Sequence, residues 1–255
     1  MTGPEKDKEQ PLIDHLIELR SRLLRVVIFI LLLLLVLLPF ANSIYQFIAT
    51  PLLAKLPPGS SMIATEVASP FFAPFKLTLF CAIFVAIPYI LYQVWGFIAS
   101  GLYAEEKKLA LPILSSSIIL FYVGILFAYF IVFPLLFAFL TTTAPAGIKI
   151  MTDINHYLNF ILKLFFAFGV SFEIPIATFL VVRAGLVSVD RLAENRPYII
   201  LAAFIVGMLL TPPDVISQIL LAIPIWILFE SGLFISRHWA IKHEAKPEED
   251  LKQPD

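Results

Sequence analysis

The sequence has few charged residues for its length. Charged side chains make up 15% of its 255 residues and hydrophobic side chains 60%, whereas a soluble domain averages about a quarter charged and about half apolar. Too little polar surface remains to cover a water-soluble fold, so the apolar excess needs lipid to face. The formal net charge of −1 also lacks the basic excess typical of nucleic-acid-binding proteins. The composition indicates an integral membrane protein and no nucleic-acid partner.

Cysteine and histidine are scarce as well. Because Cys81 is the single cysteine, the chain has no intrachain disulfide and no cluster of thiolate metal ligands. The four histidines fall at the ends of apolar runs or in the tails, where none is placed to activate a nucleophile. The sequence lacks the G-x-S-x-G and H-E-x-x-H patterns and a phosphate-binding glycine loop. We therefore predict no enzyme activity, no catalytic residue, no metal site and no cofactor.

Lysine and arginine are distributed unevenly along the chain. Fourteen of the eighteen fall in four polar stretches, at 1–25, 107–108, 183–196 and from 237 onward, with long apolar runs between them. Cationic loops of membrane proteins stay on the cytoplasmic side. This alternation predicts an all-α, polytopic membrane protein with six transmembrane helices and with both termini in the cytoplasm.

The six apolar runs have unequal lengths. We expect spans near 23–45, 76–99, 112–140, 157–182, 198–210 and 215–235, in a single transmembrane domain (1–240) followed by a disordered cytoplasmic tail (241–255). A helix needs about 20 residues to cross the hydrocarbon core. The 13 residues of 198–210 reach only about 20 Å. The membrane is therefore expected to be thinner beside this fifth span.

Glu173 lies inside the fourth apolar run, where an ionised carboxylate costs about 2.5–3.5 kcal/mol. It either faces a polar element or water-filled cavity, or it is a protonated group bonded to a neighbouring helix. Pro175 predicts a kink close to this acid. One alternative function is a proton-coupled small-molecule secondary transporter that uses Glu173. Another is an intramembrane hydrolase that uses Ser171 or Ser217.

Other charged residues lie at the predicted membrane surfaces. Residues 11–25 have apolar side chains on one side of a helix, and Glu18, Arg20 and Arg22 lie among them. These charges either only solvate the outer side of the helix or bind a ligand. Glu106, beside two lysines in the first cytoplasmic loop, has the same two interpretations. Asp214 follows two prolines and is predicted to cap the sixth helix.

Several stretches together resemble one family. They are H-L-I-E-L-R-S-R-L at 15–23, A-S-P-F-F at 68–72, Q-V-W-G-F-I-A-S-G-L-Y-A-E-E at 93–106, F-G-V-S-F-E-I-P at 168–175, R-P-Y at 196–198 and G-M-L-L-T-P-P-D-V-I-S-Q at 207–218. With these motifs the chain resembles the TatC family, the polytopic receptor subunit of the twin-arginine protein translocase, over roughly 11–237. The resemblance implies a curved, concave bundle of six helices. It also implies recognition of folded precursor proteins by a signal of the S/T-R-R-x-F-L-K kind.

The resemblance assigns signal-peptide binding to Glu18, Phe97 and Glu106, with Arg20 and Arg22 near the same site. The chemistry is consistent with this assignment, because a guanidinium presents a planar fork of donors that a carboxylate accepts at two points. A lysine lacks the fork, so a twin-lysine signal should bind less well. Phe97 is expected to stack on the ligand or to shield it from water.

The resemblance also assigns further positions and partners. Glu173 is implied to face the cavity, and three further residues are implied to dock single-span TatA/TatB-type subunits: Met208, Thr211 and Gln218. Three more fall in the outer loops: Pro51, Glu66 and Asp214. The family implies several copies within a hetero-complex in the bacterial cytoplasmic (inner) membrane. Because the chain has no nucleotide-binding motif, the proton-motive force is the expected source of energy.

Overall fold

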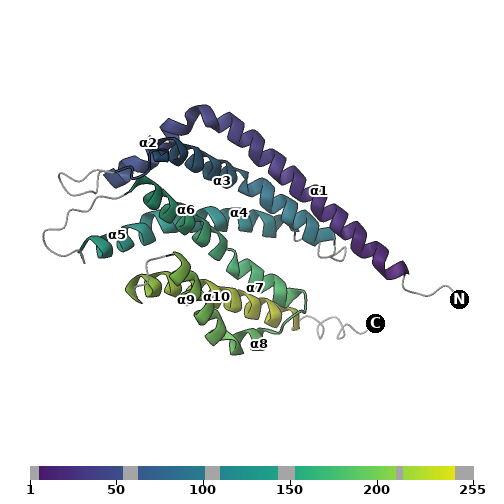
Figure 1. Ribbon diagram of the computed structural model, residues 1–255. Helices are drawn as coiled ribbons and strands as arrows, with labels where there is room; N and C mark the ends of the chain where they lie inside the picture. Colours follow the sequence, from purple (N-terminus) through teal and green to yellow (C-terminus); the bar gives the residue numbers. More distant parts are fainter. Residues whose placement is uncertain (1–5, 54–62, 101–109, 143–152, 211–214, 245–255) are drawn as a thin grey trace, which may run out of the picture. The chain divides into compact units, whose positions relative to one another are not determined.

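The computed structural model describes residues 6–53, 63–100, 110–142, 153–210 and 215–244. These residues form helices and short turns, apart from one isolated bridge between Ile63 and Asp153. In chain order the elements are α1 (Lys6–Leu37), the short η1 (Leu38–Phe40), α2 (Ala41–Leu53), α3 (Ser69–Ser100), α4 (Ala110–Phe127), the π-helix η3 (Ala128–Val132), α5 (Phe133–Thr142), α6 (Ile154–Ser171), α7 (Ile174–Arg183), α8 (Val189–Glu194), α9 (Arg196–Leu210) and α10 (Val215–Glu244) (Figure 1). The all-α prediction is confirmed.

Five helical segments in the described part of the chain are long and apolar enough to cross a membrane. They are Leu16–Ile48, Ser69–Phe97, Leu111–Phe139, Ile154–Arg183 and Gln218–His238. The sixth predicted span corresponds to α9, which is apolar but has only 15 residues. A polytopic helical membrane protein is therefore confirmed, and the fifth predicted segment is indeed short. The count of six crossings and the side on which the termini lie stay predictions.

Helix ends differ from the predicted span limits because polar turns extend beyond the apolar runs. α1 begins at Lys6, well before the predicted start at residue 23. α10 continues to Glu244, beyond the predicted end at residue 235 and into the first residues of the expected tail. The rest of that tail, 245–255, lies outside the described residues.

The chain divides into two compact units. The first contains Met1–Ile118 and Lys149–Leu162, and the second contains Ile119–Ile148 and Lys163–Asp255. The prediction of one domain over 1–240 stays a prediction.

In the first unit, α1 and α2 pack on α3. Phe29 of α1 meets Tyr89 of α3 with ring centroids 4.5 Å apart. α3 stays helical past Pro74, whose carbonyl accepts a hydrogen bond from the Thr78 hydroxyl at 2.8 Å. Most of α1 keeps its apolar side chains exposed, for example Leu35 at 66%. Such a surface suits a helix that faces lipid.

In the second unit, glycines bring α4 and α6 close together. A Cβ on Gly124 would lie 2.6 Å from the Phe168 carbonyl oxygen, and one on Gly169 would lie 2.7 Å from the Phe121 ring. The π-helix η3 follows α4 and ends just before Pro134. Proline removes a donor and its ring crowds the carbonyl four residues earlier. The wider π turn accommodates that change without ending the helix.

The predicted kink at Glu173 and Pro175 is confirmed as a break between α6 and α7. Phe172 and Glu173 form a turn in which the Glu173 N–H donates to the Val170 carbonyl at 3.0 Å. Pro175 then stands in the first turn of α7, where its missing N–H costs least. The acid thus immediately precedes a new helix.

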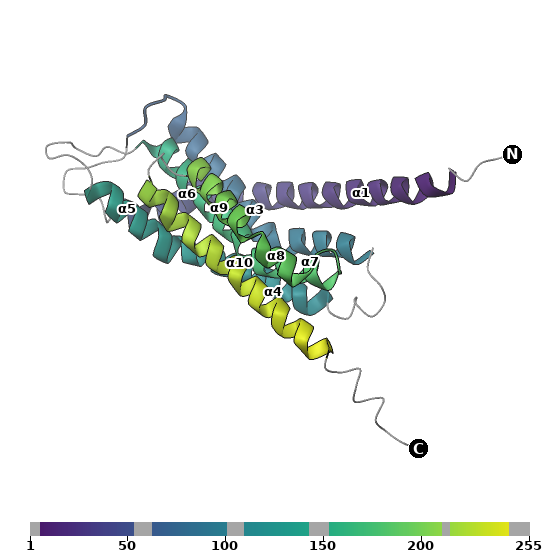
Figure 2. The ribbon, with the colours of Figure 1, turned by 90° about the horizontal axis from the view of Figure 1, so that it is seen from below.

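α10 is the packing partner of α7 and α9 in the second unit (Figure 2). Ala203 of α9 and two α10 residues, Ala222 and Ile225, form a buried cluster at this contact. Gly232 of α10 lies against α7, because a Cβ there would be 2.9 Å from Pro175 Cα. Small side chains of this kind let helices approach closely without a driving force from water.

Candidate functional site

A polar cluster joins α1 to α3. The Arg22 guanidinium donates from Nε and from Nη2 to Glu18 Oε1, at 2.9 and 2.7 Å. Its Nη1 donates to the Gln93 side-chain oxygen at 3.3 Å and to the Gln93 backbone carbonyl at 3.5 Å. Glu18 and Arg22 stand one turn apart on α1, so their side chains meet on one side of the helix. We call Glu18, Arg22, Gln93 and Gly96 the guanidinium seat.

The guanidinium seat is partly shielded from water. The exposed fractions of the side chains are 22% for Arg22 and 33% for Glu18, and Gln93 is buried at 5%. Gly96, one turn after Gln93, leaves room for the Arg22 guanidinium, since a Cβ there would overlap Arg22 Nη1 and lie 3.1 Å from Cζ. Partial shielding strengthens hydrogen bonds between charged groups relative to those at a fully exposed surface. The arrangement holds the guanidinium of Arg22 between α1 and α3.

The structure brings only some of the predicted signal-binding residues together. Glu18 and Arg22 are in contact, and Phe97 directly follows Gly96 on α3, where it is partly buried. Arg20 lies on α1 with an exposed side chain. Glu106 lies outside the described residues. Sequence reasoning missed Gln93 and Gly96, although both fall in the motif at 93–106, because their role depends on which face of α3 meets α1.

A second polar cluster ties the segment before α3 to the start of α6. The Asp153 carboxylate accepts hydrogen bonds from the Thr65 hydroxyl at 2.7 Å and the Thr65 N–H at 3.0 Å. It also accepts from the N–H groups of Asn155 and His156, at 2.8 and 3.1 Å. Asp153 is therefore the N-cap of α6. Sequence analysis missed this cap, although an aspartate directly before a helical apolar run is a signal that could have found it.

These bonds change the acidity of Asp153. The Thr65 hydroxyl, followed by the Thr65 and His156 N–H groups, lowers the pKa of this carboxyl from 3.8 to about 2. Four donors stabilise the charged form, and this outweighs the opposing effect of desolvation. Glu66 lies in the same segment with an exposed side chain, and its Oε2 accepts from the Asn155 amide at 3.5 Å.

The remaining predicted residues are spread over the second unit and the outer segments. Glu173 precedes α7 and its Oε1 is buried. Met208 of α9 is 53% exposed, and the Gln218 backbone is 3.4 Å from the position that a Cβ on Gly207 would take. Pro51 lies in α2. Two predicted residues lie outside the described ranges: Thr211 and Asp214.

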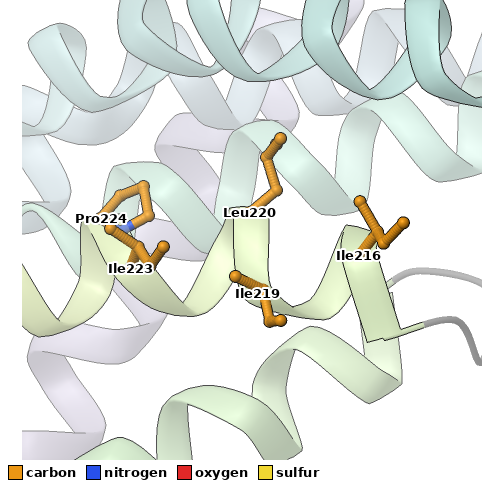
Figure 3. Close-up of a pocket in the computed structure, with 5 residues that line it drawn as sticks. All are labelled: Ile216, Ile219, Leu220, Ile223 and Pro224. Carbon is orange, nitrogen blue, oxygen red and sulfur yellow. The ribbon is translucent and has the colours of Figure 1, made fainter.

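One side of α10 carries an apolar groove near its first residues (Figure 3). The groove has a volume of about 320 Å³ and is lined by Ile216, Ile219, Leu220, Ile223 and Pro224. Ile219 and Ile223 are 40% and 49% exposed. In the described part of the chain, no group of three or more histidine, cysteine or acidic residues is placed to hold a metal ion.

Comparisons with known proteins identify the family. Residues 14–224 match the model of the family described as Sec-independent protein translocase protein (TatC). The chain belongs to the TatC family. It is 55% identical over 244 residues to the TatC protein of Azotobacter chroococcum, covering 96% of this chain and 95% of the relative. It is 54% identical over 239 residues to that of Escherichia coli K12, covering 94% and 93%.

A solved structure agrees with the family assignment. The crystal structure of a twin-arginine translocase receptor, TatC, superimposes with a TM-score of 0.79 at 37% identity, over 88% of this chain and 98% of that chain. A second crystal structure of the receptor, in DDM, gives 0.80 at 38% identity, over 87% and 99%. The resemblance stated from the motifs is confirmed, and so is the prediction of a protein-translocase subunit rather than an enzyme. The transporter alternative finds no support.

Proposed function

We propose that this protein is the core receptor and scaffold of a twin-arginine translocase, which binds the signal peptides of folded precursor proteins. Its TatC relatives are Sec-independent translocase proteins, and a solved relative is described as a twin-arginine translocase receptor. The observation on this chain that carries the proposal is the guanidinium seat. Glu18 accepts two hydrogen bonds from one guanidinium. This is the chemistry that recognition of arginine requires.

In this proposal the two signal arginines dock at Glu18 and Glu106. Phe97 stands beside Gly96 on α3 and shields the bound ligand. Arg20 and Arg22 border the same site on α1. The apolar part of the signal then enters the membrane beside the helices, and Glu173, at the break between α6 and α7, contacts it or a partner helix.

Single-span TatA/TatB-type subunits are proposed to dock at Met208, Thr211 and Gln218, of which Met208 lies on α9 and Gln218 on α10. The apolar groove on α10 supports this assignment, because its branched side chains can pack against the transmembrane helix of a single-span partner (Figure 3). Several copies of the chain are proposed to assemble within the hetero-complex, and the proton-motive force drives export.

The proposed setting is the bacterial cytoplasmic membrane, with both termini in the cytoplasm and six helices forming one concave domain over 1–240. The 15 residues of α9 are too few for a membrane of average thickness. Local thinning beside α9 would ease passage of a folded precursor. Pro51, Glu66 and Asp214 are proposed to maintain the outer loops, which the hydrogen bond between Glu66 and Asn155 supports.

The proposal is tested by binding of a twin-arginine signal peptide to purified protein in detergent. Glu18→Gln and Glu106→Gln are expected each to weaken binding about tenfold, since each removes a charged acceptor. Glu194→Gln, an exposed glutamate of α8, is the control and should leave affinity unchanged. Unchanged affinity in the double Glu18 and Glu106 variant would overturn the docking mechanism.

A further inference from the structure

We propose that Arg22 is a built-in competitor of the signal peptide, which occupies Glu18 until an arginine of the ligand displaces it. This inference rests on the proposed function of Glu18 and specifies how that site is regulated. Arg22 has the same functional group as the proposed ligand. Its guanidinium already donates two hydrogen bonds to Glu18 Oε1, on the carboxylate that the proposed function assigns to a signal arginine.

The geometry makes simultaneous occupation of the same oxygen unfavourable. Arg22 Nε and Nη2 converge on Glu18 Oε1 at 2.9 and 2.7 Å. A second guanidinium placed on that oxygen would meet Arg22 at close range, and like charges at short distance repel strongly in a shielded site. A ligand arginine therefore binds there only when the Arg22 side chain moves away.

α3 supplies the second half of the seat. Gln93 offers two oxygens to Arg22 Nη1, at 3.3 and 3.5 Å, and Gly96 provides the space in which that nitrogen lies. Glu18 alone would hold Arg22 only as a pair within one helix, which is worth little. The Gln93 oxygens raise the occupancy of the seat by Arg22 and so determine how strongly it competes.

The competition has a measurable consequence. A ligand that binds only the fraction of molecules with a vacated Glu18 shows an apparent affinity reduced by that fraction. The reduction is the same for every ligand that uses Glu18. Loss of Arg22 should therefore increase the affinity for twin-arginine and twin-lysine peptides by one common factor, without changing the preference between them.

Two variants vacate the seat in different ways. Arg22→Gln removes the competing cation. Gly96→Ala keeps every charge but places a Cβ where Arg22 Nη1 now lies, so that the flexible guanidinium is pushed out. Arg25→Gln is the control, because it removes the same charge from the same helix. Arg25 is exposed and donates a hydrogen bond to Ser21, outside the guanidinium seat. The affinity change in this control measures the general electrostatic effect.

We expect each seat variant to bind the twin-arginine peptide about 3- to 10-fold more tightly than its reference. The reference for Arg22→Gln is the Arg25→Gln variant, and the reference for Gly96→Ala is the unmodified protein. Adding Glu18→Gln to Arg22→Gln should abolish that gain. If Arg22 instead positions Glu18, both seat variants bind more weakly, and if it plays no part, they match their references. Either result overturns the inference.

The two proposals fail in distinguishable ways. If Glu18→Gln weakens peptide binding but neither seat variant strengthens it, only the competitor role of Arg22 is wrong. If Glu18→Gln alone leaves binding unchanged, the proposed docking of the signal at Glu18 is itself wrong, and the competitor role falls with it.

Discussion

Arg196, the first residue of α9, forms a bidentate ion pair with Glu230 of α10. Nε lies 2.5 Å from Oε1 and Nη2 lies 2.9 Å from Oε2. The side chains are 40% and 30% exposed. The pair connects positions 34 residues apart, and it holds the beginning of α9 against α10. Because α9 is short and has few turns that pack on other helices, this ion pair contributes to holding its first turn in place.

The first prediction concerns this ion pair. Arg196→Gln and Glu230→Gln should each lower the midpoint of thermal unfolding in detergent, by about 2–4 °C. Arg196→Lys should recover only part of the loss, since an ammonium cannot reproduce the planar fork. Arg191→Gln, an exposed change in α8, serves as control. If the double variant is destabilised by the sum of the single effects, Arg196 and Glu230 are not coupled and the prediction is wrong.

The second prediction concerns the contact of α7 with α10. Gly232→Ala should destabilise the protein by about 1–3 kcal/mol, because the new Cβ would lie 2.9 Å from Pro175 Cα and 3.0 Å from Thr178 Cβ. Backbone atoms cannot move aside as a long side chain can, so the helices must separate. Gly207→Ala on α9 is the matched control, since its closest contact would be an ordinary 3.4 Å. The stability of both variants is compared by denaturation in the same detergent. Equal stability would contradict the close packing of α7 and α10.

The third prediction is a pH dependence at Asp153. The pKa of this carboxyl is lowered in the folded protein to about 2, from an ordinary 3.8. A lowered pKa means that the folded state binds the proton less readily, so the carboxylate stabilises the fold above about pH 4. That contribution is lost as the pH falls from about 4 to 2. As the pH falls through this range, the protection factors of the Thr65 and His156 amides, measured against the intrinsic exchange rate at each pH, should therefore decrease.

Variants separate this effect from general acid unfolding. In Asp153→Asn at least one of the two amides should already exchange faster at neutral pH, because one of the two carboxylate oxygens that accept from them is replaced by a donor. Asp190→Asn, at an exposed position in α8, should behave like the unmodified protein. A protection factor at Thr65 that stays constant between pH 4 and 2 would show that the carboxylate does not hold this segment.

The fourth prediction concerns the apolar groove on α10. Ile223→Trp should fill the groove and reduce co-purification of single-span subunits about tenfold, as expected for a contact at the centre of an interface. Ile235→Trp is the control, because Ile235 has the same exposed fraction of 49% on the same helix and lies outside the groove. Equal recovery of the partners with both variants would place their docking surface elsewhere.

Much of the fold follows from the sequence. Long apolar runs separated by charged stretches predict the five long helices, and the short fifth run corresponds to α9. Pro175 predicts the break beside Glu173, because a proline removes a backbone donor wherever it stands. The ends of α1 and α10 were less predictable, since charged residues are good helix formers and continue a helix beyond the apolar run.

The site was only partly predictable, because local patterns do not specify contacts between distant helices. Glu18 and Arg22 are one helical turn apart, so their pairing follows from spacing. Gln93 and Gly96 depend on how α3 faces α1, which no local pattern gives. The resemblance to TatC pointed to Glu18 and Phe97, but it could not reveal that Arg22 donates hydrogen bonds to both Glu18 and Gln93. The ion pair between Arg196 and Glu230 was equally unpredictable, because it depends on how α9 packs against α10.

The most direct test of the account is a map of the protein with a signal-bearing precursor bound, detailed enough to place both signal arginines. The account predicts one guanidinium within about 3 Å of a Glu18 carboxylate oxygen and the other at Glu106. Both arginines bound away from these two glutamates would contradict it.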